Sequence, residues 1–170
     1  MKKIFKISVF VFAIALVLAS CKPVREQVEI KGCELESLEG VSLGLGQVSF
    51  NTLLKLDASN ASGRDISLAR LYATIFTKSG KEVATVTYSG QKGDPLPTLS
   101  RRSEQAVDIP LEVVFDNPLS AITLAAMSLD DYAAKGYTVS YDCTLKSGCI
   151  KKRFKGEKVP VETIVKMLDK

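Results

Sequence analysis

The sequence has no histidine and no tryptophan among its 170 residues. The absence of histidine excludes Ser-His-Asp and Cys-His nucleophile systems, and also every metal site that needs an imidazole ligand. The absence of tryptophan removes the largest aromatic platform on which a sugar ring stacks. The excess of basic over acidic side chains is also small, since 23 basic and 19 acidic side chains leave a net charge of +4. Nucleic-acid-binding domains are usually far more basic, so we expect no nucleic-acid partner.

The N-terminal part of the chain contains one apolar run, which is shorter than a bilayer-spanning helix requires. Residues 7–19 are apolar apart from Ser8, and residues 1–6 before them carry three lysines and no acidic side chain. A transmembrane helix needs about 20 apolar residues, whereas a shorter run after a basic start is typical of a secretory signal peptide. We therefore predict that residues 1–20 are cleaved, which leaves 20 basic and 19 acidic side chains.

The apolar run ends in Leu18-Ala19-Ser20-Cys21. This segment resembles the lipobox of bacterial lipoproteins, in which the cysteine thiol receives a diacylglycerol and signal peptidase II cuts directly before it. The resemblance implies cleavage between Ser20 and Cys21, and lipidation of Cys21 with palmitate-type acyl chains. Two or three such chains hold a domain on a membrane nearly permanently, because each buried methylene contributes about 0.8 kcal/mol. The alternative is an ordinary cleaved signal in which Cys21 has no role.

Residues 21–27 are polar and contain one proline, so they predict a short tether to a single domain at residues 28–170. In the lipoproteins of proteobacteria, an aspartate directly after the lipidated cysteine implies retention in the inner membrane, but here that residue is Lys22. Surface-exported lipoproteins of the Bacteroidetes type often carry an acidic cluster there, which this tether lacks. We therefore expect an anchor in the outer membrane, with the domain facing the periplasm.

The domain itself has the alternation of β-strands. Residues 48–56, 107–115 and 137–145 alternate apolar and polar side chains, as antiparallel strands with one buried face do. Residues 66–76 and 83–88 flank a short turn that contains glycine, which predicts a hairpin. These patterns favour a mainly β fold.

Four local signals refine this prediction. The apolar parity changes across Gly32, which indicates a β-bulge, and Pro110 cannot donate to a ladder, which indicates an edge position around it. Residues 117–135 begin with Asn-Pro and then repeat apolar residues at helical spacing, so we predict one inserted helix. Residues 161–168 predict a short C-terminal helix. Together, the predicted strands and the two helical segments favour an immunoglobulin/fibronectin-III-like antiparallel β-sandwich.

Residues 50–76, with an Asn-containing turn at 60–65, resemble the core of the late-embryogenesis-abundant (LEA) type 2, or WHy, domain. In that family the second strand ends in a charged hairpin, and a later strand has the apolar-Pro-apolar pattern found here at 109–111. The usual Asn-Pro after the first strand is here Asn60-Ala61. The resemblance covers residues 28–115 best. It implies a fibronectin-like sandwich associated with desiccation and stress responses, and it brings no catalytic residue.

Three cysteines remain after lipidation, and an envelope compartment permits disulfides. Cys143 and Cys149 are the closest pair in sequence and predict a small stapled loop, although Cys149 is out of phase with the apolar side chains. A bond from Cys33 to Cys143 is the alternative, and three free thiols are a third possibility. A thiol nucleophile is disfavoured because no histidine is present to lower its pKa.

A basic stretch follows in a predicted hairpin near the C-terminus. One interpretation is contact with anionic lipid head groups or phosphates, and the other is a solvated edge whose lysines discourage aggregation. The side chains of this candidate contact are Lys146, Lys151, Lys152, Arg153 and Lys155.

Two classes of function remain. The first is a non-catalytic, membrane-anchored lipoprotein that binds an unidentified protein, glycan or hydrophobic surface, or that protects under water stress. The second is a glycan-active enzyme or accessory subunit that uses carboxylates only, which requires two inward carboxylates about 5 to 9 Å apart. Aspartates and glutamates are scattered singly along the predicted strands, which favours the first class. We expect no enzymatic activity, no metal site and no cofactor.

Overall fold

The computed structural model describes residues 27–168, which form eight β-strands and three short helices. The strands are β1 (Val28–Gly44), β2 (Gln47–Asn60), β3 (Ile66–Phe76), β4 (Glu82–Tyr88), β5 (Thr98–Leu99), β6 (Ser103–Phe115), β7 (Thr138–Ser147) and β8 (Ile150–Pro160). The helices are α3 (Pro118–Ala126), α4 (Leu129–Ala134) and α5 (Val161–Leu168). Within residues 27–168 no helix has both the length and the apolar character needed to cross a bilayer. The predicted mainly β fold is confirmed.

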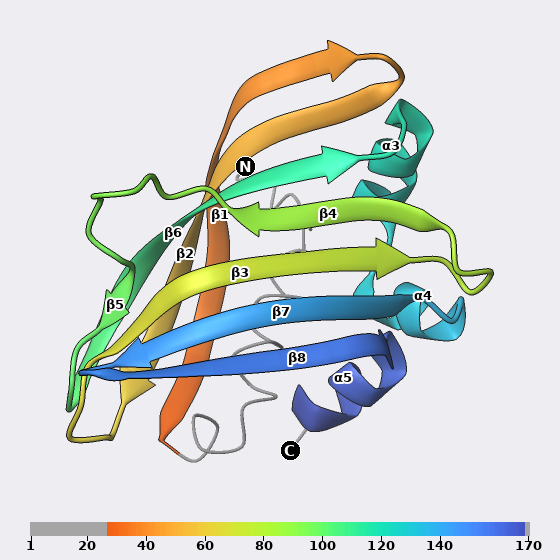
Figure 1. Ribbon diagram of the computed structural model, residues 1–170. Helices are drawn as coiled ribbons and strands as arrows, with labels where there is room; N and C mark the ends of the chain where they lie inside the picture. Colours follow the sequence, from red (N-terminus) through yellow and green to blue (C-terminus); the bar gives the residue numbers. More distant parts are fainter. Residues whose placement is uncertain (1–26, 169–170) are drawn as a thin grey trace, which may run out of the picture.

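All eight strands belong to one antiparallel sheet that curls over on itself. The strand order is β1-β2-β6-β4-β3-β7-β8, with the short β5 paired to β3. The ladder between β4 and β6 covers only Ala84–Tyr88 and Leu111–Phe115, and there the sheet turns over. As a result β1 and β2 pass behind β3, β7 and β8 (Figure 1). The outermost strands, β1 and β8, remain the two edges of an open sheet.

Of the predicted local features of the strands, the bulge and the hairpin turn are present, and the edge position is correct in part. The register of β1 against β2 shifts between Ile30 and Gly32, which confirms the bulge. The turn between β3 and β4 is closed by Gly80, whose φ of 84° is in the left-handed region that favours glycine. The ladder of β6 with β4 ends at Leu111, directly after Pro110. The edge position is therefore correct only for the first half of β6, because its second half lies between β2 and β4.

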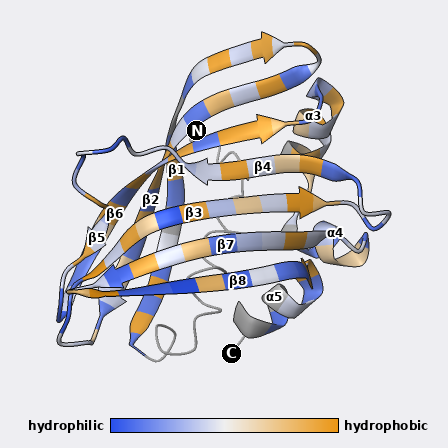
Figure 2. Ribbon diagram, in the orientation of Figure 1, coloured by the Kyte–Doolittle hydropathy of each residue, from blue (hydrophilic) through white to orange (hydrophobic). Residues whose placement is uncertain are grey.

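The inner face of the curled sheet makes the core. Figure 2 shows hydrophobic and hydrophilic residues alternating along the strands, and the strands between the two edges, such as β2, β6 and β7, contribute rows of apolar side chains to the interior. Fully buried examples are Leu54 on β2, Leu71 on β3 and Val86 on β4. Among the residues whose burial is described, the buried ones lie between Thr52 and Val161, and Val28, Ile30 and Leu35 of β1 pack partly buried against them.

The insertion between β6 and β7 contains two short helices where we predicted one. Helix α3 starts as expected, with Asn117 as N-cap and proline in its first turn. It ends at Met127, whose backbone is extended, because the chain then begins a new helix with its own cap. Ser128 and Asp131 form a reciprocal capping box at the start of α4. The strong second cap divides the predicted helix into two.

Candidate functional site

Three connections meet at one end of the curled sheet, at the left of Figure 1. They are the loop after β2 at residues 61–65, the turn between β5 and β6 at 100–102, and the turn between β7 and β8 at 148–149. The backbone N–H of Arg102 donates to Ser62 O at 3.1 Å, which ties the first two together. We call this part of the molecule the basic end, for the six cationic side chains described below.

Asn60 organises these loops from inside the fold. Its side chain is 1% exposed, and its Nδ2 donates to Arg64 O at 2.9 Å, to Ser100 O at 3.2 Å and to Leu99 O at 3.3 Å. The Oδ1 of Asn60 accepts from Ser62 N at 2.9 Å. A single buried amide thus joins the backbone of both loops, in addition to the bonds that Ser62 Oγ and Ser103 Oγ donate to Arg64 O and Ser100 O. The position of the loops therefore depends on this side chain.

A cleft of about 480 Å³ opens at the basic end, between the two edges of the open sheet. Gln27, which precedes β1, lies on one side, and Ile150, Lys152 and Phe154 of β8 lie on the other. The lining is mainly apolar, and a volume of this size is in the range of small-molecule sites. The remaining lining residues are Ser62, Gly63, Arg64, Ile66, Leu145 and Ser147. A shallower groove beside it reaches Asp65, Arg101 and Cys149.

The loops and the β7–β8 hairpin bring six cationic side chains to this end. Lys146 and Lys151 are direct partners across the β7–β8 ladder, and Lys152 follows on β8. Arg64 lines both clefts, while Arg101 lines the groove and Arg102 follows it. Asp65 is the carboxylate among them, and it accepts the backbone N–H of Arg101 at 2.8 Å. The three arginines are far from the lysines in sequence, and they are not part of the contact predicted from the basic stretch. No signal in the sequence pattern brings them together, because the ladders of β3 with β5 and β7 decide it.

The predicted basic stretch separates into two groups. Lys146, Lys151 and Lys152 belong to the basic end, but Arg153 lies further along β8 and donates through Nε to Asp142 Oδ1 at 2.8 Å. Lys155 is also 4.0 Å from the carboxylate of Asp142. The hydrogen bond from Arg153 holds the pKa of Asp142 below its ordinary value. These two cations are therefore partly neutralised within the protein.

The two cysteines of the β7–β8 hairpin lie in different environments. Cys143 is buried opposite Phe154, whereas Cys149 is an exposed free thiol in the turn. Ser147 pairs with Ile150, so four residues of extended strand separate Cys143 from the turn. Four strand residues span about 13 Å, and a disulfide needs Cα atoms within about 7 Å. The predicted Cys143–Cys149 bond is not formed in this structure. The alternative with Cys33 stays a prediction, since that side chain is not described.

Ser20 and Cys21 of the lipobox lie outside residues 27–168. Within the described residues no group of three or more Cys, Asp or Glu side chains is arranged to hold a metal ion. Asp65 is the one carboxylate among the described residues that line the cleft and the groove. The described residues that line the cleft and the groove thus do not include the pair of carboxylates required for glycan hydrolysis.

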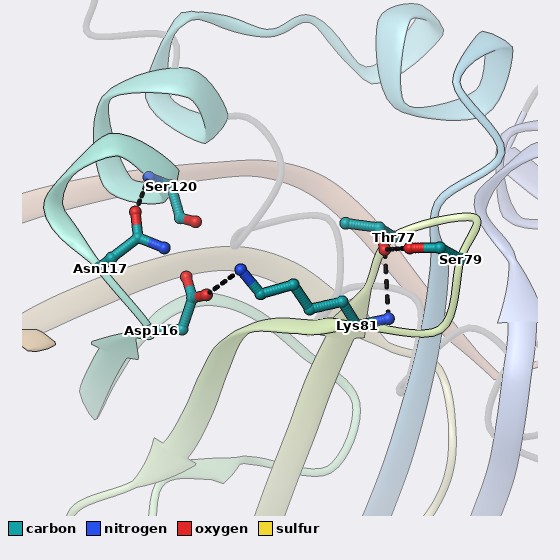
Figure 3. A network of polar contacts seen from close by, with 6 residues as sticks. All are labelled: Thr77, Ser79, Lys81, Asp116, Asn117 and Ser120. Carbon is teal, nitrogen blue, oxygen red and sulfur yellow. Dashed lines mark hydrogen bonds and ion pairs between the residues drawn. The ribbon is translucent and has the colours of Figure 1, made fainter.

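A second polar network lies at the opposite end of the sheet and joins the β3–β4 turn to the start of α3 (Figure 3). Lys81 Nζ is 3.1 Å from Asp116 Oδ2, and the Oδ1 of Asn117 accepts from Ser120 N at 2.8 Å. Burial raises the pKa of Asp116, but the Ser120 side chain and the Lys81 ammonium outweigh burial and hold this pKa below its ordinary value. The Oδ1 of Asp116 is buried without a hydrogen-bond partner among the described residues. This network fastens α3 to the sheet.

Comparison with known proteins gives similarities to solved structures alone. No protein-family model and no curated protein sequence matches this chain. A solved structure of a protein from Archaeoglobus fulgidus is similar over 76% of this chain and 98% of its own, with a TM-score of 0.38 and 13% identity. A solution structure assigned to the LEA proteins is similar over 87% of this chain and 83% of its own, with a TM-score of 0.32 and 12% identity. TM-scores this low carry no argument about the fold or the function of this chain.

Proposed function

We propose that this protein is a non-catalytic lipoprotein of the cell envelope whose β-domain is a binding module of the LEA type 2, or WHy, kind. Its anchor is the lipid on Cys21, and the outer membrane, on the periplasmic side, is its expected location. The observation that carries the binding function is the apolar cleft of about 480 Å³ at the basic end. The first class of function from the sequence is therefore preferred to the glycan-active enzyme.

The lining of the cleft suggests the chemistry of its ligand. Ile66, Leu145 and Phe154 supply apolar surface, and Arg64 and Lys152 supply positive charge. An amphipathic anion, with an aliphatic or aromatic body and an acidic head group, matches both features. Burial of the apolar body drives binding, while the two cations select a negatively charged head group.

Occupation of the cleft by a bulky side chain should abolish binding of such a ligand. Gly63 lines the cleft, and a Cβ placed on it meets no atom within 4 Å, so Gly63→Trp puts an indole over the opening without a backbone clash. We expect the anionic aromatic probe anilinonaphthalene sulfonate to bind the folded wild-type protein. We expect Gly63→Trp to weaken that binding by at least tenfold, or about 1.4 kcal/mol. The measurement is a fluorescence titration.

Gly44→Trp is the matched control, because the Cβ of Gly44 also meets no atom within 4 Å and the residue lies at the far end of β1. This variant should bind the probe as the wild type does. Equal affinities for all three proteins would contradict the assignment of the cleft as the binding site.

The anchor is tested separately in cells. Full-length protein should fractionate with the outer membrane, and Cys21→Ala should lose both acyl labelling and outer-membrane fractionation, because alanine offers no thiol for the thioether. Ser20→Gly serves as control, since it keeps a small residue before the cleavage point. Protease added to intact cells should leave the wild-type domain uncut until the outer membrane is opened. Acylation that persists in Cys21→Ala would disprove the lipobox assignment, and cleavage of the domain on intact cells would disprove its periplasmic location.

A further inference from the structure

The chain enters the described domain at the basic end. Gln27 lines the cleft there, and its carbonyl accepts the backbone N–H of Ala61 at 2.8 Å, which fixes the entry point beside the loop after β2. Cys21 is six residues before Gln27. Six residues span at most about 20 Å even when fully extended. An anchor on Cys21 therefore keeps the basic end within about 20 Å of the lipid surface.

The same end carries a local excess of positive charge among the described residues. Its cations are Arg64, Arg101, Arg102, Lys146, Lys151 and Lys152, and Asp65 is the carboxylate among them. The mature chain as a whole is almost neutral, so the surplus at this end reflects the distribution of charge and not the composition. At the tip of the β7–β8 turn, Ile150 is 57% exposed. An apolar tip surrounded by cations is the composition that favours contact with anionic head groups.

We propose that the basic end docks on the anionic phospholipid surface of the membrane that holds the anchor. The arginines and lysines contact head-group phosphates, Ile150 contacts the interface, and the cleft opens towards the lipid. This inference rests on the proposed anchoring for the orientation of the domain, whereas the affinity of the basic end for anionic lipid is a property of the domain alone. It extends the predicted contact of the basic stretch, because it adds three arginines from two loops and leaves out Arg153 and Lys155, which are occupied by Asp142.

The test uses the chain from Lys22 onwards, without lipid, because the buried core of the described residues lies between Thr52 and Val161. Co-sedimentation with phosphatidylglycerol vesicles is compared with co-sedimentation with phosphatidylcholine vesicles. We expect binding to the first and little binding to the second. We also expect release when salt is raised from about 0.1 M to about 1 M, which shortens the Debye length from about 10 Å to about 3 Å.

A pair of double variants locates the contact. Arg101→Gln with Lys151→Gln removes two exposed cations from the basic end, and Lys78→Gln with Lys135→Gln removes two from the opposite end. The first pair should weaken vesicle binding by roughly 25-fold, at about fivefold for each charge near the surface. The second pair should bind as the wild type does. Circular dichroism and thermal unfolding confirm that both variants fold.

Equal weakening by both pairs would mean that only net charge matters, and it would overturn the proposal. So would equal binding to the two kinds of vesicle, or none to phosphatidylglycerol at low salt. The vesicle experiment uses a chain without lipid, whereas the Cys21→Ala experiment measures acylation in cells. A negative result in the vesicle experiment therefore does not affect the conclusion about the anchor. Failure of the docking surface and failure of the anchor are thus told apart.

Discussion

Asn60→Asp should destabilise the protein by about 3–5 kcal/mol, measured as the free energy of unfolding in urea at neutral pH. The amide nitrogen of Asn60 donates to the carbonyls of Arg64, Leu99 and Ser100 at 2.9–3.3 Å. A carboxylate at this position has no donor, so its negative charge is buried against three carbonyl oxygens. The loops that carry Arg64 and Arg101 should lose their positions, and binding to anionic vesicles should fall as well.

Asn117→Asp is the control, since aspartate keeps the acceptor that caps α3 and loses only the contact of the amide with the Asp116 carboxylate. Asn117 caps α3 by accepting from Ser120 N at 2.8 Å, and aspartate is an equally good N-cap. We expect its effect to stay below about 1 kcal/mol.

The pH dependence gives a second readout for the Asn60→Asp variant. Burial against carbonyl oxygens raises the folded-state pKa of the introduced carboxyl above the unfolded value of about 3.9. The destabilisation is therefore largest above this raised pKa and decreases as the pH falls towards about 4, where the neutral acid becomes a donor. A loss of stability that did not change between about pH 7 and pH 4 would contradict the role given to the amide.

Tyr132→Ala should cost about 3–5 kcal/mol in the free energy of unfolding. Tyr132 is fully buried, its hydroxyl donates to Leu124 O at 2.7 Å, and its ring packs edge-on against Tyr137 at 5.1 Å between centroids. Removal of the ring leaves a cavity between α3, α4 and the start of β7. Tyr72→Ala is the control, since Tyr72 is 43% exposed on the outer face, and we expect it to cost no more than about 1 kcal/mol.

Tyr132→Phe separates the hydroxyl from the ring and should cost about 0.5–1.5 kcal/mol, because Leu124 O loses its bond from the hydroxyl at 2.7 Å and keeps the one from Met127 N at 3.4 Å. Burial also raises the pKa of Tyr132 above its ordinary range. The stability linked to this raised pKa is fully present below the unfolded value of about 10, and it is lost as the pH rises above that value. The wild type should therefore lose stability more steeply than Tyr132→Phe above about pH 10. Parallel profiles for the two proteins would contradict this.

Most strands could be predicted because each buries one face. The period-two pattern of residues 107–115 and 137–145 matches the alternating burial seen on β6 and β7. The bulge at Gly32 was also visible, since a bulge changes the parity of the side chains. Local interactions between neighbours in sequence determine such features, so a single sequence contains enough information to predict them. The division of the inserted helix was missed because helical spacing continues across the capping box at Ser128.

The candidate site could be predicted only in part. The lysines of the β7–β8 hairpin are close in sequence and were identified as a candidate contact. Arg64 and Arg101 stand apart from them, and they join the site because β3 pairs with both β5 and β7. The disulfide prediction for Cys143 and Cys149 relied on short spacing along the chain, but an extended strand places such residues far apart.

The sequence by itself determined the antiparallel strands, the caps of α3 and α4, and the pattern that predicts a lipid anchor at Cys21. Each of these depends on residues that are neighbours in the chain, through alternation, capping or a short motif. Only the tertiary structure decided that one curled sheet remains open between β1 and β8, that an apolar cleft lies at one end, and that cations from two loops and the β7–β8 hairpin lie at the same end. The physical reason is that the β2–β6 and β3–β7 ladders join residues 43 to 79 positions apart, and no local pattern specifies which strands become neighbours.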